Sequence, residues 1–284
     1  MHPEADLSRY AVVLVPSLYL ATDAAAANVA AAVRAGAHAV VSFFNGIVDE
    51  HDHARLGGYP GAFADLLGVR VEEFHPLPPG EGVGLDDGTA ATTWIEDVGA
   101  RDAEPVVRYA GGAYAGRPAV TRREVGDGVA WYAGARLDDD SLERLLSWVC
   151  EEAGVAAVVP GCPRGMEAVR RRDAYGDLLF LLNHTDQPAR LEAAGMDLLT
   201  GARHDRHVEL PAEASPCSAR RMGDSGQYST PSARHRNSMN GLAFAARASH
   251  SSRKPLAVAC RCVSEDTIAK LLRLMSSISG WSAR

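Results

Sequence analysis

The sequence predicts an α/β fold, with a parallel, doubly wound sheet between helices and a small antiparallel β unit after it. Three observations lead to this prediction. Short, continuous apolar runs, typical of strands buried on both faces, alternate with helix patterns over residues 10–74. Strand-forming residues separated by glycine turns dominate residues 81–134. Short strands around a turn follow in residues 165–211.

The first elements form a strand–helix–strand unit. Tyr10–Val15 is a short apolar run and is predicted to be a buried strand. Thr22 can cap a helix that continues to about Ala35, where Gly36 ends it. Val40–Phe44 is the second buried strand. Right-handed crossovers between such strands build a parallel sheet.

A third helix–strand unit and a strand-rich region follow. Pro60 begins a short helix, Gly68 ends it, and Val69–Phe74 is the third predicted strand of the parallel sheet. Turn signals then recur at 86–88, 111–112 and 126–128. These turns predict several short strands before the next helix.

The last predicted helix of the first domain begins at three aspartates, Asp138 to Asp140, whose charge suits a helix N-terminus. Its apolar residues recur at the spacing of one buried face: Leu142, Leu145, Leu146 and Val149. Gly154 ends this helix. We therefore expect residues 1–154 to form one domain with helices on both faces of a central sheet.

A small antiparallel β domain is predicted for residues 155–212. Met166–Arg172 and Leu178–Asn183 flank a turn, and further short strands are expected near 190–192 and 207–210. About 50 residues give a thin core, so we expect this unit to lean on the first domain.

The charge distribution divides the chain at about residue 212. Residues 1–212 carry 18 Lys and Arg against 32 Asp and Glu, whereas residues 213–284 carry 11 against 4. Serine follows the same division, with 5 before and 14 after it. Two compositions indicate two origins or two roles. The acidic body argues against nucleic-acid binding.

The composition also indicates the cellular location of the protein. The sequence contains no run of about 18 apolar residues and no signal-peptide pattern at Met1–Tyr10, so no membrane partner is expected. The chain has 5 cysteines, an odd number at low density, which does not fit a disulfide framework. We therefore expect a cytoplasmic protein.

Several motifs together resemble one known family. The most specific are GIVDEHDH at 46–53 and LGGYPG at 56–61, and further matches lie at 6–10, 66–74, 180–185 and 197–201. In this order they resemble the C-terminal part of the family 42 glycoside hydrolases, which are bacterial β-galactosidases. The resemblance covers about residues 6–211. It implies a flavodoxin-like trimerisation domain followed by a small C-terminal β domain.

The same resemblance implies that no catalytic residue lies in this chain. A retaining glycosidase needs two carboxylates about 5 Å apart, and in this family both are glutamates of a preceding (β/α)₈ barrel. The sequence starts at or just after that barrel. We therefore expect a non-catalytic assembly region, with no catalytic, substrate-binding or metal-binding residues and no cofactor. Its expected partners are further copies of the chain, as a homotrimer, or a separately encoded barrel.

The end of the resemblance coincides with the change in composition. After Val208–Pro211 the family closes its last domain with a strand, whereas here a Ser/Arg-rich stretch begins. A frameshift or truncation explains this pattern, and a fused unrelated segment is the alternative. We expect residues 213–284 to be a Ser/Arg-rich tail that is atypical of the family, and residues 213–263 to lack a packed fold.

One loop, residues 45–61, is chemically the richest place. Its polar and aromatic residues are the candidate interface: Asn45, Asp49, Glu50, His51, Asp52, His53 and Tyr59. The loop follows a strand end, where α/β sheets place ligand sites. A metal site is one interpretation, but adjacent residues cannot all face one ion. A polar loop at a subunit interface, or at the rim of a neighbour's active site, is favoured by the resemblance.

Two other enzyme classes can be weighed for the first domain. A flavin site needs a small, phosphate-binding loop after the first strand, whereas Pro16–Leu20 is bulky and apolar. A free-standing amidotransferase needs a nucleophilic cysteine on a tight strand–helix turn. Cys150 lies on an amphipathic helix, and Cys162 precedes Pro163, which has no N–H to offer. Neither cysteine fits that role.

Weaker signals lie in the β unit and the tail. A carbohydrate-binding module needs exposed aromatic rings, and 165–211 offers only Tyr175 and Phe180. The arginines at 170–172 are expected on a solvated strand. The tail residues that resemble a zinc site, with the wrong spacing, are Cys217, His250, Cys260 and Cys262. Ser264 begins a helix pattern with apolar residues at Ile268, Leu271, Leu272 and Met275. A pattern of this length can also arise by chance in a tail of 72 residues.

Overall fold

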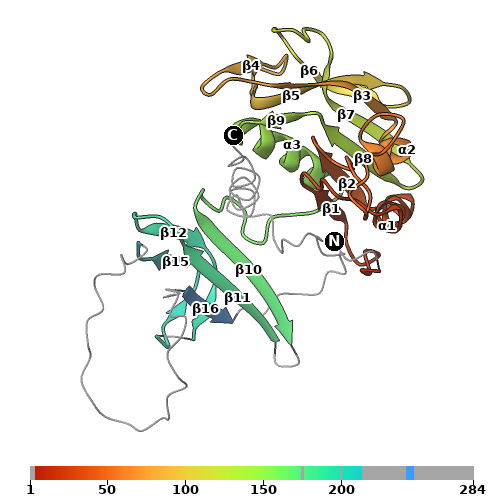
Figure 1. The fold of residues 1–284 in the computed structure, drawn as a ribbon. Helices are drawn as coiled ribbons and strands as arrows, with labels where there is room; N and C mark the ends of the chain where they lie inside the picture. Colours follow the sequence, from red (N-terminus) through yellow and green to blue (C-terminus); the bar gives the residue numbers. More distant parts are fainter. Residues whose placement is uncertain (1–3, 174–175, 199, 213–240, 246–284) are drawn as a thin grey trace. The chain divides into compact units, whose positions relative to one another are not determined.

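The structure is a computed structural model that describes residues 4–173, 176–198, 200–212 and 241–245 (Figure 1). These residues form two compact units, which divide between Ala156 and Ala157. The helices of the first unit are α1 (Asp23–Arg34), the 3₁₀ helix η1 (Gly61–Phe63), α2 (Ala64–Leu67) and α3 (Asp139–Glu152). In the described part of the chain, no helix is long and apolar enough to cross a membrane.

The strands of the first unit form two sheets. They are β1 (Val12–Val15), β2 (His38–Ser42), β3 (Val69–Pro76), β4 (Gly82–Gly84), β5 (Ala90–Ala100), β6 (Glu104–Arg108), β7 (Pro118–Val125), β8 (Gly128–Ala133) and β9 (Ala135–Leu137). The first sheet has the order β1-β2-β8-β7-β6. The second has the order β3-β5-β4, and β9 also pairs with β5.

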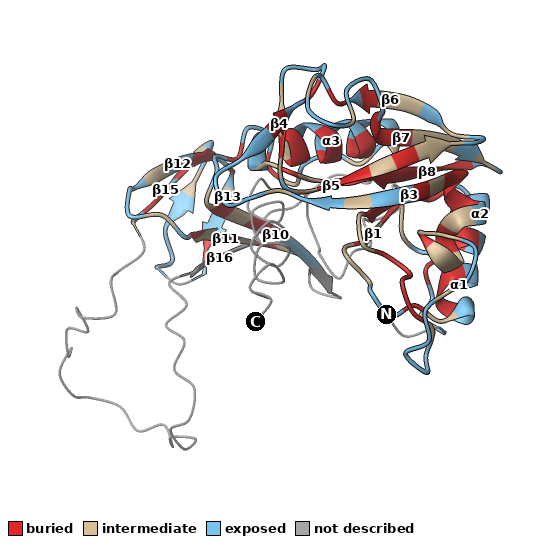
Figure 2. Ribbon diagram, turned by 45° about the horizontal axis from the view of Figure 1, so that its top comes forward, coloured by how far each residue is buried: buried red, intermediate tan, exposed pale blue. Residues whose placement is uncertain are grey.

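The predicted parallel arrangement is confirmed for β1 and β2, and β8, from the strand-rich region, joins them in parallel. β2 pairs in parallel with β1 and with β8. The register places Val15, Val41 and Tyr132 on one face of the sheet, where they share a core with α1 and α2. The alternate residues face α3, so helices cover both faces of this half. Figure 2 shows that buried residues follow these strands.

Both long helices begin where predicted, with Thr22 and Asp138 as their N-caps. The Thr22 hydroxyl accepts a hydrogen bond from Ala25 N over 3.0 Å, and an Asp138 carboxylate oxygen accepts from Ser141 N over 2.8 Å. These bonds satisfy amide groups that have no partner within the helix. The short α2 ends at Gly68, whose φ of 63° lies in the left-handed region that glycine adopts readily.

The prediction of a doubly wound parallel sheet is wrong for the rest of the unit. β8, β7 and β6 pair antiparallel, because a tight turn at 126–127 and the loop 109–117 connect them instead of helices. The run 69–74, predicted in the parallel sheet, is part of β3 and pairs antiparallel with β5. Glu72 and Glu73, at the irregularity in the β3–β5 register, are exposed, so this part of β3 is solvated. β1 lies at the sheet edge, although its side chains are largely buried.

The second unit is antiparallel throughout its described strands, as predicted. These are β10 (Met166–Asp173), β11 (Gly176–Asn183), β12 (Ala189–Glu192), β13 (Gly195–Asp197), β14 (Arg203–His204), β15 (His207–Leu210) and β16 (Gly241–Ala245). One sheet has the order β10-β11-β16-β13-β14, and β12 pairs with β15 separately. The buried core includes Met166, Leu181, Leu191 and Val208.

β16 corrects the expectation that residues 213–263 contain no packed structure. Gly241–Ala245 pairs antiparallel with both β11 and β13. A short segment of the Ser/Arg-rich tail therefore takes part in the sheet of the second unit. The remaining tail, 213–240 and 246–284, lies outside the described residues, and so does the helix pattern after Ser264.

Candidate functional site

The predicted interface loop, residues 45–61, is bonded to the elements around it. Val71 N, in β3, donates a hydrogen bond to Tyr59 O over 2.8 Å. The Arg55 guanidinium lies 2.6 Å from the carboxylate of Asp23 at the start of α1. These contacts hold the loop between the second sheet and α1, beyond the carboxyl end of β2.

Two glycines allow the ends of this loop to meet. Gly46 and Gly61 have φ values of 61° and 54°. A Cβ atom at Gly61 would lie 1.9 Å from the Gly46 carbonyl oxygen, and one at Gly46 would lie 2.5 Å from the Pro60 carbonyl oxygen. Both positions therefore require glycine for the backbone conformation and for the close approach.

Asn45 is buried and supports the loop from inside. Its side-chain oxygen accepts from Leu18 N over 2.8 Å, and its Nδ2 donates to Ser42 O over 2.6 Å and to Val15 O over 3.1 Å. Asn45 thus links the loop after β1 to the end of β2. Because its side chain has no exposed surface, its role in this structure is to position the loop.

Asp49 organises the exposed part of the loop. Its Oδ1 accepts hydrogen bonds from the backbone N of His51 and of His53, both over 2.9 Å. The bond from His53 N contributes most to lowering the pKa of Asp49. Glu50, His51, Asp52 and His53 are exposed, and Asp52 has a φ of 61°. Within the described residues, no group of three or more His, Cys, Asp and Glu side chains is placed to hold a metal.

A set of aromatic side chains beside the loop was not predicted. We define this aromatic cluster as Tyr19, Phe43, Phe44, Tyr59, Phe74 and Trp94. Ring centroids lie 5.4 Å apart for Tyr19 and Phe44, 5.1 Å for Phe44 and Trp94, and 4.8 Å for Tyr59 and Phe74. Tyr19 is 42% exposed, and the other rings are partly buried. Tyr59 joins the cluster to loop 45–61.

The backbone under the cluster is strained. Phe44 has a φ of 57°, a left-handed conformation that bulky residues rarely adopt. Such conformations persist only where the surroundings enforce them. Here Phe44 N donates to Glu96 Oε1 over 3.1 Å, and its ring packs between those of Tyr19 and Trp94.

Glu96 is a fully buried carboxyl group behind the aromatic cluster. Its Oε1 accepts from Trp94 Nε1 over 3.1 Å as well as from Phe44 N, and its Oε2 accepts from the Tyr132 hydroxyl. Tyr109 Oη accepts a hydrogen bond from Glu96 N and donates one to Glu96 O, both over 3.2 Å. Burial raises the pKa of Glu96 to about 7. The pattern Trp94-Ile95-Glu96 within a strand is the signal that sequence reasoning missed.

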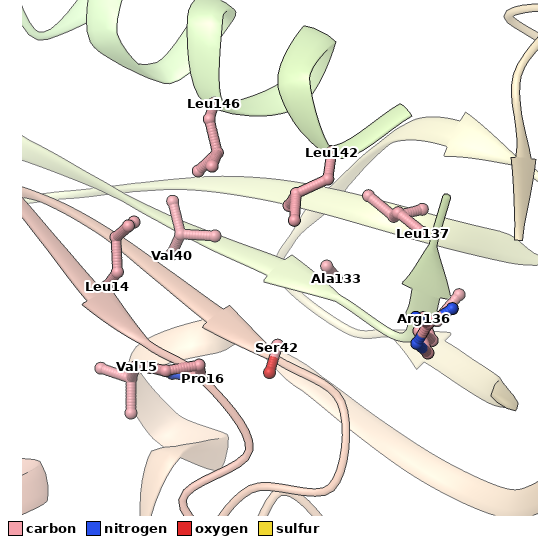
Figure 3. A pocket seen from close by; sticks show the side chains of 11 residues that line it. Leu14, Val15, Pro16, Val40, Ser42, Ala133, Arg136, Leu137, Leu142 and Leu146 are labelled. Carbon is pink, nitrogen blue, oxygen red and sulfur yellow. The ribbon is translucent and has the colours of Figure 1, made fainter. Parts of the chain in front are cut away.

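A cavity lies between α3 and the carboxyl ends of β1, β2 and β8 (Figure 3). Leu14, Val40 and Leu142 form part of its wall, and Arg136 is the one charged residue among those that line it. Arg136 Nη1 donates to Thr92 Oγ1 over 2.7 Å. The lining offers no pair of groups for acid–base chemistry. Its one hydroxyl, that of Ser42, accepts a hydrogen bond from Ser17 N over 2.8 Å and has no histidine or carboxylate beside it in the lining.

The cysteines considered as nucleophiles are buried. Burial raises the pKa of the Cys150 thiol to about 11, which disfavours the reactive thiolate. Cys162 is also buried. In the loop after β1, Ser17 N and Leu18 N already donate to Ser42 Oγ and Asn45 Oδ1, so these amides are not free for a phosphate.

The weaker candidates lie in the second unit and the tail. Arg170 and Arg171 are exposed on β10, and Phe180 is partly buried in β11. The side chains of Arg172 and Tyr175 lie outside the described residues. The same is true of the tail residues Cys217, His250, Cys260 and Cys262.

Comparisons with known proteins agree with the arrangement of two units. The family model described as the β-galactosidase trimerisation domain matches residues 1–156, and the one described as the β-galactosidase C-terminal domain matches residues 165–213. A β-galactosidase from Arthrobacter sp. is 49% identical over 215 residues, which are 75% of this chain and 31% of that protein. β-Galactosidase LacZ from Heyndrickxia coagulans is 39% identical and covers 74% of this chain and 32% of its own length.

Solved structures give the same result. The β-galactosidase from Bacillus circulans sp. alkalophilus is 32% identical with a TM-score of 0.69, over 74% of this chain and 33% of that one. The β-galactosidase from Rahnella sp. R3 is 26% identical with a TM-score of 0.68, over 75% and 32%. The chain thus spans about a third of the length of the relatives that it matches. It belongs to the glycoside hydrolase family 42 β-galactosidases, of which it contains the trimerisation and C-terminal domains.

Proposed function

We propose that the first unit assembles the chain into a homotrimer through loop 45–61 and the adjoining aromatic cluster. The observation that carries the proposal is the set of partly exposed rings joined to the loop by Tyr59, on a domain of the trimerisation family. Aromatic side chains are enriched in the centres of protein interfaces, and polar groups at their rims. The exposed residues 50–53 suit such a rim.

The proposal gives the predicted interface residues different tasks. Tyr59 contacts the partner subunit, with the aromatic cluster around it. Asp49 fixes the turn that presents Glu50, His51, Asp52 and His53. Leu56 is 99% exposed at the loop and adds apolar surface to the contact. Asn45 positions the loop without touching the partner.

We assign hydrolysis of β-galactosides, the activity in the relatives' names, to a barrel outside these 284 residues. The two matched domains occupy residues 1–156 and 165–213, and a (β/α)₈ barrel needs about 250 residues. A separately encoded barrel is the alternative partner of the first unit. The acidic residues of 1–212 argue against a nucleic-acid partner.

Three further expectations remain proposals. The domain boundaries are proposed at 154/155 and 212/213. We propose that the parallel half of the first unit, which consists of β1, α1, β2 and β8, is flavodoxin-like. A cytoplasmic location is proposed because the chain has 5 cysteines, an odd number at low density that does not fit a disulfide framework.

Sedimentation of the purified chain over a wide concentration range tests the assembly. We expect a concentration-dependent trimer that the double variant Asp49→Ala with Tyr59→Ala weakens at least about tenfold in dissociation constant, since truncating a central aromatic anchor costs about 2 kcal/mol. The matched control is Trp148→Ala with Glu151→Ala, which removes an exposed ring and an acid from α3 and should leave the trimer intact. An unchanged trimer in the loop variant would mean that another surface makes the contact.

A further inference from the structure

The sheet of the second unit is held together by a strand that lies beyond the residues matching the family's C-terminal domain. β16 pairs with β11 from Leu178↔Ala245 to Leu182↔Gly241. On its other side it pairs with β13, at Met196↔Ala245 and Asp197↔Phe244. In the described sheet, β11 and β13 have no pairing with one another, so β16 alone joins the β10–β11 hairpin to the β13–β14 pair.

We call the space between β11 and β13 the strand slot. Empty, it would expose the unpaired N–H and C=O groups of two strand edges, which is an unfavourable state that proteins avoid. Apolar surface lies beside it, since Met196 and Leu198 are each 50% exposed. The slot therefore favours an occupant that is extended and apolar.

The present occupant is joined to the domain by a long connection. The family's C-terminal domain ends at residue 213 in this chain, and β16 begins at Gly241. Fully extended, the intervening segment 213–240 can span roughly 90–100 Å. The connection therefore does not confine residues 241–245 to the slot of their own chain.

We propose that the strand slot accepts residues 241–245 of a second copy of the chain, so that copies associate by exchanging β16. Strand pairing uses backbone groups, which are the same in both copies. The contacts made within a chain and between chains are thus identical, and the two states differ only in the effective concentration of the strand. This second association point does not depend on the trimer proposed for the first unit.

A full-length variant, Ala243→Pro, tests the slot. Proline removes a backbone N–H and is excluded from central strands, so the variant cannot fill its own slot. A fluorescent peptide with the sequence of residues 239–247 should bind this variant at least tenfold more tightly than the unaltered chain, whose slot is occupied. The same peptide carrying the proline should not bind, and Ser232→Pro, in the connecting segment, should leave binding as in the unaltered chain.

Disulfide trapping tests the exchange between copies. In a background without the native cysteines, one copy carries Phe180→Cys and another carries Ala243→Cys, which are directly opposite in the β11–β16 register. Mixing followed by oxidation should give a disulfide-linked heterodimer. Val169→Cys is the matched control, because Val169 lies on β10, with β11 between it and the slot, and should give none.

Two results would overturn the proposal. One is failure of the peptide to bind the folded Ala243→Pro variant. The other is a disulfide that forms within a chain carrying both cysteines but never between chains at any concentration. Neither result changes the sedimentation of the loop variant, so the outcome is separable from that of the proposed trimer.

Discussion

Replacing Glu96 with glutamine should change how the stability of the first unit depends on pH. Glutamine has nearly the same shape, and its side-chain oxygen can still accept from Trp94 Nε1 and Phe44 N. Its amide nitrogen would face the Tyr132 hydroxyl, which now donates to the carboxyl group. The substitution therefore removes one titrating group and preserves most of the packing behind the aromatic cluster.

The magnitude follows from the raised pKa. Burial moves the pKa of Glu96 from an ordinary 4.5 to about 7 in the folded chain. Below pH 4.5 the carboxyl is protonated in both states, and its contribution to stability is complete. As pH rises towards 7, the unfolded chain releases this proton first, and stability falls by up to about 3 kcal/mol. The glutamine of the variant does not titrate, so the variant lacks this loss.

Urea unfolding of both proteins at several pH values between 4.5 and 8 measures the effect. The buried His38 contributes an opposite slope, because burial lowers its pKa, so the difference between the two proteins is the quantity to follow. The variant should gain stability relative to the unaltered chain as pH rises. At every pH the variant also loses about 1 kcal/mol of stability, because the hydrogen bond from the Tyr132 hydroxyl to the carboxyl group is removed.

The control is Glu104→Gln, which removes an exposed carboxylate on β6 and should leave the pH dependence unchanged. A constant difference between the Glu96 variant and the unaltered chain across this pH range would refute the reasoning. It would mean that Glu96 has the same charge in the folded and unfolded chains, and that its three donors compensate fully for burial.

Two further outcomes are expected. Gly61→Ala should destabilise the first unit by about 2 kcal/mol or more in thermal unfolding, because its methyl group would overlap the Gly46 carbonyl; Gly57→Ala, where nothing lies within 4 Å, should lose only about 1 kcal/mol through its positive φ. The purified chain should not hydrolyse a nitrophenyl β-galactoside above background, and turnover that Glu50→Gln abolishes would reveal an active site in loop 45–61.

Local signals in the sequence were sufficient to predict the two long helices and the strands β1 and β2. Thr22 caps α1 as predicted and α3 begins at the predicted aspartates, because helix starts depend on a few neighbouring residues. The predicted strands 10–15 and 40–44 overlap β1 and β2, which pair in parallel. The motifs of loop 45–61 likewise led to the family, since they combine rare residues in a fixed order.

These local signals do not show which strands, far apart in the sequence, pair with one another in a sheet. The apolar residues of β3 could suit either sheet, and only the exposure of Glu72 and Glu73 shows that this part of the strand is solvated. The aromatic cluster gathers rings from separate segments, among them Tyr19, Phe44 and Trp94. Such a convergence depends on topology, so no single stretch of sequence reveals it.

The parallel contact of β2 with β8 also has a consequence for synthesis of the chain. Residues 43–127 lie between these two strands, and closing so long a loop is entropically costly and slow. β7 and β8, joined by a tight turn, can pair as soon as both are made. The β1–α1–β2 segment leaves the ribosome before β8, yet must wait for Ala133 before its sheet is complete. Until then the apolar edge of β2 that faces β8 is unpaired and is exposed to aggregation.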